Sequence, residues 1–124
     1  MRRLAVSILL LGALASLLAS AASASCIRTT VAEQRARADV IFDGRALDGP
    51  TATGIQRFRV SGYIKGRGPA IVRVQTGTTR RPDGTGSTTS VSLFVRRGEQ
   101  WRIFARGSSR RVLRTNVCDG SRKT

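Results

Sequence analysis

The chain has 124 residues, a net charge of +15 at neutral pH and no histidine. Its length allows one small domain but not two, and the absence of histidine excludes Ser-His-Asp and Cys-His catalysis, histidine metal sites and an imidazole base. The positive charge comes almost entirely from arginine and favours an acidic partner, although scattered arginines also serve solubility alone.

The first 24 residues have the three parts of a signal peptide. Two arginines precede an apolar run (residues 4–18), and small residues occupy positions 22–24. The apolar run is shorter than the ~20 residues that a membrane-spanning helix needs, so we expect a cleaved signal and no transmembrane anchor. Cleavage after residue 24 leaves a domain of residues 25–124 in the periplasm or outside the cell, with a net charge of +13 because two arginines leave with the signal.

Cys26 and Cys118 are the only cysteines, and export would place them in an oxidising compartment. A single pair allows one connectivity, so we predict a Cys26–Cys118 disulfide that ties the two ends of the domain together. Closing so long a loop stabilises the fold by roughly 4–5 kcal/mol in the chain-entropy description. The alternative is a lipidated Cys26. Against it, Ser23 stands where lipoprotein signals usually carry an aliphatic residue, and Cys118 would be left unpaired.

Beyond Cys26 the sequence predicts one short helix and then strands. Thr30 and Glu33 have capping-box spacing, so a helix should begin at Val31 and end at Asp39. Period-two alternation and turn residues then indicate a series of extended segments, with a bulge at Gly62. These segments are residues 40–47, 55–66, 70–76, 91–95, 101–105 and 112–117. The fourth and fifth should form a hairpin. The pattern favours an all-β fold with one short N-terminal helix, and an open five-stranded barrel suits the length best.

The longest predicted loop is residues 77–90, which contain no apolar residue except Pro82. Without an apolar anchor this loop should be exposed and mobile. Arg80 and Arg81 offer a basic pair in it, and the second is followed by Pro82, so trypsin should cut after Arg80. An anionic partner that contacts the loop should protect it.

A series of short motifs covers nearly all of the mature chain. In order, they are Cys26, Ala38-Asp39, Ile41 to Gly44, Tyr63 to Gly66, Gly98 with Trp101 and Phe104, and Leu113 to Cys118. This order resembles the bacterial proteins related to tissue inhibitors of metalloproteinases. The resemblance implies a five-stranded netrin-like OB barrel over residues 25–124. The family's usual Cys-x-Cys start and mid-chain Cys-Gly are both missing here, so one bridge is absent at both of its ends and less holds the N-terminal segment rigid.

The resemblance also implies inhibition of a zinc metallopeptidase. Animal members of the family insert the N-terminal cysteine segment into the active site and chelate zinc through the free amino group and carbonyl oxygen of that cysteine. The candidate inhibitory segment here is Cys26, Ile27 and Arg28. Chelation requires Cys26 to be the first residue, because a preceding Ser25 would turn the amine into an amide.

Neighbouring arginines are the candidate contacts for an anionic partner. They are Arg80, Arg81, Arg96, Arg97, Arg110 and Arg111, and Trp101 beside Arg102 is a further candidate. Aromatic side chains could stack on nucleic-acid bases, but core positions are the simpler assignment for most of Phe42, Phe58, Tyr63, Phe94, Trp101 and Phe104. Export also argues against a nucleic-acid partner. The sequence therefore predicts a non-enzymatic protein, without cofactor or metal, that binds an anionic envelope component or an acidic protein. Metallopeptidase inhibition is the alternative.

Overall fold

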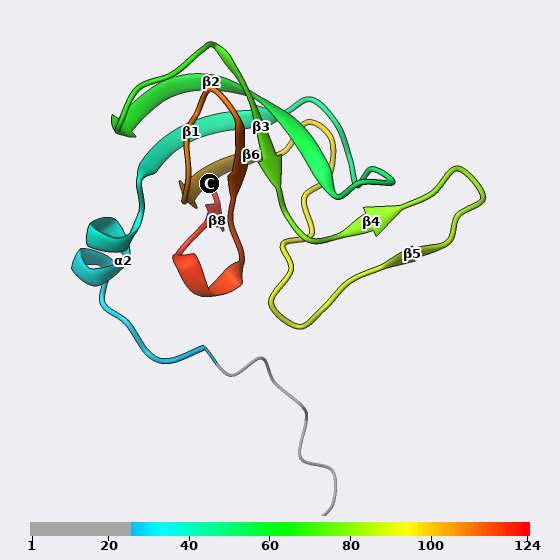
Figure 1. The fold of residues 1–124 in the computed structure, drawn as a ribbon, viewed down its shortest axis with the longest axis horizontal. Helices are drawn as coiled ribbons and strands as arrows, with labels where there is room; N and C mark the ends of the chain where they lie inside the picture. The colour runs from blue at the N-terminus through cyan, green and yellow to red at the C-terminus, as the bar shows by residue number, and fades with distance from the viewer. Residues whose placement is uncertain (1–25) are drawn as a thin grey trace, which may run out of the picture.

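A computed structural model describes residues 26–124, so the predicted signal peptide and its cleavage site lie outside the described residues. The described chain is mostly β with one short helix (Figure 1). Its elements are α2 (Val31–Arg37), β1 (Val40–Ala46), β2 (Ile55–Lys65), β3 (Ile71–Gln75), β4 (Thr79–Arg80), β5 (Gly86–Ser87), β6 (Gln100–Ala105), β7 (Val112–Arg114), the 3₁₀ turn η2 (Val117–Asp119) and β8 (Arg122–Lys123). None of the helices among residues 26–124 has the length and apolar character needed to cross a membrane.

Helix α2 begins where its capping box predicts. The Thr30 hydroxyl accepts a hydrogen bond from the Glu33 N–H at 3.2 Å, and the Glu33 carboxylate accepts one from the Thr30 N–H at 2.9 Å. The helix ends at Arg37, two residues before the predicted Asp39. The Lys65 ammonium donates to the carbonyl of Arg35 at 2.8 Å, and this contact satisfies one of the free carbonyls in the last turn.

Six strands form one sheet that curls around the core, in the order β7-β3-β2-β1-β6-β8. Strands β1, β2 and β3 are an antiparallel meander, β1 also pairs with β6, and β3 pairs with β7 in parallel. The register between β1 and β2 shifts where Asp43 faces Gly62 and Gly44 faces Val60, which confirms the predicted irregularity at Gly62. The main sheet has six strands rather than the predicted five, because β8 adds to the outer edge of β6.

The inward side chains of the curled sheet form the core. Phe42 and Phe58 are fully buried and meet edge to face with ring centroids 6.0 Å apart. Phe104 is also buried, and Tyr63 and Trp101 pack partly buried against the core, so core positions are confirmed for five aromatic residues. Phe94 is the exception. Its side chain is 49% exposed, because its neighbours Leu93 and Val95 both point inward.

Residues 91–95 are not a strand, and the predicted hairpin with residues 101–105 is wrong. Strand β6 takes both of its neighbours from β1 and β8 instead. Side-chain donors and two isolated backbone hydrogen bonds, from the Leu93 N–H to the Thr76 carbonyl and from the Val117 N–H to the Val91 carbonyl, hold the 91–95 segment in place. The Thr78 hydroxyl donates to the Leu93 carbonyl at 2.7 Å, and the buried Gln56 amide donates to the Val95 carbonyl at 2.9 Å. The apolar pattern correctly indicated alternating burial in this segment. Its backbone carbonyls, however, accept hydrogen bonds mainly from side chains rather than from a neighbouring strand.

The segment from residue 77 to 90 is mostly exposed, as predicted. It is nevertheless anchored by hydrogen bonds, contrary to our expectation. Strands β4 and β5 pair as a short hairpin, with Thr79 opposite Ser87 and Arg80 opposite Gly86. At its base Thr78 is buried, and the Arg80 N–H donates to the Thr51 carbonyl at 2.8 Å. We expected that a loop without apolar residues would lack an anchor. Threonine hydroxyls and backbone hydrogen bonds provide that anchor instead.

The C-terminal end closes the fold. Strand β7 ends at Arg114, so the predicted extended segment to residue 117 is too long. The chain then turns into η2, where the Asn116 side chain accepts a hydrogen bond from the Cys118 N–H at 2.8 Å. Cys118 forms the predicted disulfide with Cys26, and their Cα atoms are 5.3 Å apart.

Candidate functional site

The carboxylates of this chain are few, and all seven interact with neighbouring groups. Three of them accept hydrogen bonds from backbone or hydroxyl groups: Glu33, Asp39 and Asp83. The other four form ion pairs: Asp43 with Arg102, Asp48 with Arg57, Glu99 with Lys123 and Asp119 with Arg106. Most of the arginines in the described residues therefore have no carboxylate partner.

Hydrogen bonds from the paired cations hold the pKa values of three carboxyls below their usual range. The Arg102 guanidinium lowers the pKa of Asp43, Arg57 lowers that of Asp48, and the Lys123 ammonium lowers that of Glu99. These three carboxyls consequently stay ionised at neutral pH, and their three partner cations contribute little free positive charge.

Arginines lie directly opposite one another on neighbouring strands. Strand β1 places Arg45 opposite Arg59 of β2, and β2 places Arg57 opposite Arg73 of β3. Two further pairs are Arg102 of β6 with Arg122 of β8, and Arg106, just after β6, with Arg114 of β7. Side chains directly opposite in an antiparallel pair have Cβ atoms ~5 Å apart, and like charges in such positions destabilise the sheet. This arrangement therefore has a cost for folding.

Only the Arg45–Arg59 pair has no carboxylate on either member within residues 26–124, since Arg57, Arg102 and Arg106 each have one. The flanking residues on both strands point inward, so both arginines project outward into solvent. They border an open hollow of about 370 Å³, to which Ser61 and Gln100 also contribute. We call Arg45, Arg57, Arg59 and Arg73 the sheet-face arginines.

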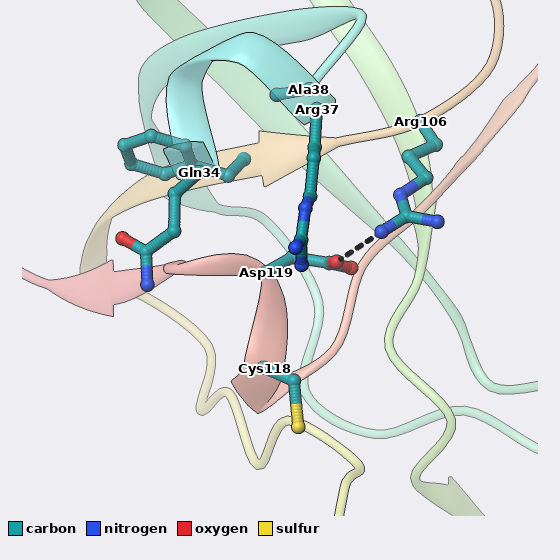
Figure 2. A pocket seen from close by; sticks show the side chains of 7 residues that line it. Gln34, Arg37, Ala38, Arg106, Cys118 and Asp119 are labelled. Atoms are coloured by element: carbon teal, nitrogen blue, oxygen red, sulfur yellow. Dashed lines mark hydrogen bonds and ion pairs between the residues drawn. The ribbon is translucent and has the colours of Figure 1, made fainter. Parts of the chain in front are cut away.

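A larger basic cleft lies beside β7. Its volume is about 680 Å³, and its lining includes Arg106, Arg111, Arg114, Ser108 and Asn116. A smaller hollow lies next to it, between α2 and η2 (Figure 2). Figure 2 shows Arg106 reaching across this hollow to Asp119, at 3.2 Å, so the ion pair partly neutralises the boundary between the two hollows. Arg111 and Arg114 have no ion pair among the described residues.

The structure places the six arginines predicted from sequence in three different turns, all exposed. Arg80 and Arg81 belong to the β4–β5 hairpin. Arg96 and Arg97 precede β6, where the Arg96 guanidinium lies 5.6 Å from the centre of the Phe94 ring. The remaining two, Arg110 and Arg111, lie in the turn between β6 and β7. They do not form one site, and their role as contacts stays a prediction.

Trp101 and Arg102 do not act together either. Trp101 points inward and packs against the core, whereas Arg102 points outward to Asp43. Sequence reasoning missed the sheet-face arginines because it considered arginines adjacent in sequence. Their signal was present in the alternation of arginine with apolar residues along β1, β2 and β3, but only the strand register shows which of them are opposite.

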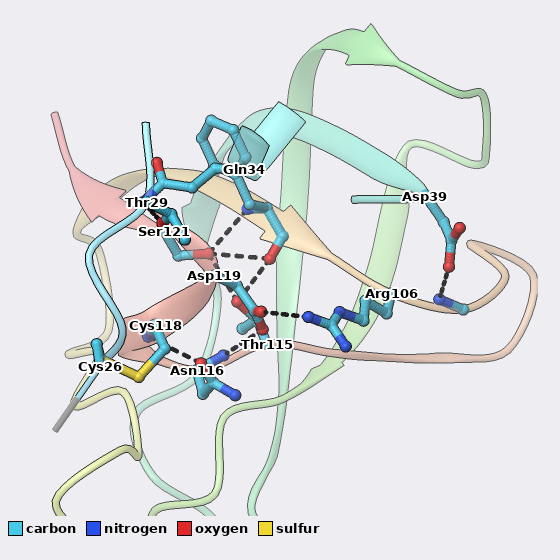
Figure 3. Close-up of polar contacts among 12 residues, drawn as sticks. Cys26, Thr29, Gln34, Asp39, Arg106, Thr115, Asn116, Cys118, Asp119 and Ser121 are labelled. Carbon is cyan, nitrogen blue, oxygen red and sulfur yellow. Dashed lines mark hydrogen bonds and ion pairs between the residues drawn. A yellow bond between two sulfur atoms is a disulfide. The ribbon is translucent and has the colours of Figure 1, made fainter. Parts of the chain in front are cut away.

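The candidate inhibitory segment lies at the start of the described residues. Cys26, Ile27 and Arg28 are exposed, and the Ile27 side chain is 85% exposed. Figure 3 shows the disulfide to Cys118 fixing this segment beside η2. The segment is therefore attached covalently at Cys26, and its next side chain projects into solvent.

Comparison with known proteins gives no further guide. No family model, curated protein or solved structure matches this chain significantly. The likeness to tissue-inhibitor-related proteins consequently rests on the order of the motifs alone.

Proposed function

We propose that this chain is an exported, non-enzymatic protein that binds an anionic envelope component or an acidic protein through the sheet-face arginines. The observation that carries the proposal is the Arg45–Arg59 pair. Two guanidinium groups are held opposite each other without a carboxylate, although the fold would be more stable without their repulsion. An anionic group bound between them would remove that repulsion.

A matched pair of charge variants tests the proposal. Arg45→Gln/Arg59→Gln should elute from an immobilised sulfated polysaccharide at clearly lower salt than the unmodified protein. Arg35→Gln/Arg37→Gln has the same net charge but changes exposed arginines on α2, and it should elute close to the unmodified protein. Equal shifts for both variants would show that net charge alone drives retention, and would overturn the proposal.

We infer that the barrel belongs to the OB type, in its netrin-like variety. The β1-β2-β3 meander, the parallel pairing of β3 with β7 and the pairing of β1 with β6 support this inference. The isolated bridge between Arg106 and Arg114 adds support, because it joins the end of β6 to β7 and completes a circuit of five strands. If the barrel has five strands of the OB type, β8 is an additional strand at the edge of β6.

Metallopeptidase inhibition is the second candidate function, and the exposed Cys26–Arg28 segment favours it. A segment fixed by a disulfide with a projecting Ile27 has the character needed to enter an active-site cleft. Zinc chelation through Cys26 additionally requires a free amino group on that residue. N-terminal sequencing or intact mass of the exported protein decides this requirement. A start at Ser25 would rule out chelation by Cys26.

A further inference from the structure

The outward arginines continue beyond one pair and form a track across the sheet. Arg45 lies opposite Arg59, Arg57 lies opposite Arg73, and the parallel pairing of β3 with β7 places Arg114 next to Gln75. Neighbouring strands are ~4.8 Å apart, residues two apart along a strand are ~6.7 Å apart, and diagonal neighbours are ~7–8 Å apart. Successive arginines of this track are therefore spaced at short, fairly even intervals. We call Arg45, Arg59, Arg57, Arg73 and Arg114 the arginine track.

The track ends in the basic cleft beside β7. Arg114 belongs to both, and Arg111, which has no ion pair among the described residues, continues the positive charge into the cleft. From β1 to β7 the track crosses three gaps between strands and advances by four residues along them, so its ends are roughly 20 Å apart along the sheet. This is the length of an extended chain of several units rather than of a single small anion.

The curvature of the sheet argues for a flexible ligand. The sheet curls from β1 to β7 (Figure 1), so we expect outward side chains at its two ends to point in different directions. A flat lipid surface would meet only part of the track at once, whereas a flexible chain can follow all of it. The outward positions of β1, β2 and β3 carry no aromatic residue, so the track offers no platform for stacking nucleic-acid bases.

Neutral polar side chains accompany the arginines. Gln100 lies opposite Arg45, and Gln75 lies opposite Arg114. Each amide offers both a donor and an acceptor, and an acceptor needs a ligand that carries hydroxyl or amide hydrogens. Arginine forks match carboxylate and phosphate groups in two-point contacts. A hydroxyl-bearing chain with repeated acidic groups satisfies both kinds of side chain.

We propose that the arginine track binds a linear acidic polysaccharide, which lies across β1, β2, β3 and β7 with one end in the basic cleft. This inference rests on the proposed function and adds the class of the partner and its direction over the sheet. Four arginines of the track each contribute one ionic contact along the chain: Arg45, Arg59, Arg73 and Arg114. Arg57 is already paired with Asp48 and lies between them. Gln75 and Gln100 bind hydroxyl groups beside the arginines.

Acidic oligosaccharides of defined length test the inference. Affinity for oligogalacturonates should increase with chain length from two units until the oligomer spans the track, and should then level off, because only chains of that length reach all of its arginines. Arg73→Gln and Arg114→Gln should weaken binding of the longest chain several-fold but leave the shortest chain unchanged. Each should also lower the dependence of log Kd on log salt by ~0.7–0.9. Arg35→Gln is the matched control and should change neither quantity.

Three results would overturn the inference. One is equal affinity for short and long oligogalacturonates. The others are preferential binding to anionic phosphatidylglycerol vesicles and preferential binding to inorganic polyphosphate. These results leave the proposed function intact wherever Arg45→Gln/Arg59→Gln still reduces binding. The proposed function fails separately if that variant and the α2 control bind every anionic probe alike.

Discussion

Asp43 shows how single carboxylates determine where positive charge remains. Its carboxylate accepts two hydrogen bonds from Arg102, both 2.7 Å long, and its side chain is about one-third exposed. Arg102 lies opposite Arg122, so Asp43 neutralises the centre of a like-charge pair. At the Arg45–Arg59 pair no such residue is present. The placement of a few acidic residues therefore divides otherwise similar arginine pairs into neutralised and free ones.

Asp43→Asn should lower the free energy of unfolding at pH 7 by ~1 kcal/mol, a value that allows for solvent screening of this partly exposed pair. Arg102 holds the pKa of Asp43 below 3.8, so the unfolded chain takes up the proton at higher pH than the folded protein does. The stabilisation by Asp43 is thus complete above about pH 5 and decreases as pH falls below 3.8, through the folded-state pKa. Chemical denaturation at pH 7 and at pH 2.5 measures both values. A difference between the two proteins that stays constant down to pH 2.5 would contradict this account.

At the scale of elements, the β4–β5 hairpin is the least secured part of the fold. Its strands are two residues each, and its anchors are polar rather than apolar. Gly86 is essential to the pairing, because an added Cβ there would collide with the Thr79 carbonyl oxygen across the hairpin. Gly62 in β2 is the opposite case, since an added Cβ meets nothing within 4 Å.

Gly86→Ala should open the hairpin and accelerate trypsin cleavage after Arg80, which is held in β4 in the unmodified protein. Each ~1.4 kcal/mol of lost hairpin stability corresponds to about tenfold faster cleavage when the open form is the one cut. Gly62→Ala is the control and should be cut at the original rate. The products are read by mass after reduction, because the disulfide keeps both fragments together. If the unmodified hairpin is already cut at the limiting rate of an unfolded peptide, the pairing of β4 with β5 is not stable in solution.

Local patterns predicted those elements whose determinants are local. Helix α2 follows from a capping box that lies within four residues, and β1, β2, β3 and β6 follow from alternation along single strands. The prediction of a strand at residues 91–95 was wrong, because alternation indicates which side chains are buried but not which groups form hydrogen bonds with the backbone. The donors to these residues come from the side chains of Gln56 and Thr78 and from the Val117 N–H, all of which are distant in sequence.

The candidate site was less predictable than the fold. Arg45 and Arg59 are fourteen positions apart in sequence, and their opposite placement follows from a strand register that contains two irregularities. A shift of one residue would turn either arginine to the other face of the sheet. Composition predicts a basic surface, but the position of the charge on that surface follows only from the pairing of strands.

For the whole molecule, the Cys26–Cys118 disulfide is the main covalent constraint. Cys26→Ser/Cys118→Ser should lower the free energy of unfolding by ~2–5 kcal/mol, with a decrease in Tm of ~4–8 °C for each kcal/mol. Reduction of the unmodified protein should give the same Tm as the double variant, which serves as the control for effects of the serines. An unchanged Tm after complete reduction would show that other contacts already hold the N-terminal segment.

The bridge also determines how the protein responds to mechanical tension. A force applied to residues before Cys26 and to the C-terminal end passes directly through the two sulfur atoms, since the bridge spans a separation of 92 residues. The force bypasses the chain between the cysteines, and only the short tail after Cys118 can lengthen, once β8 has detached from β6. Pulled by its ends, the oxidised molecule is an almost inextensible link, whereas the reduced molecule would unravel strand by strand.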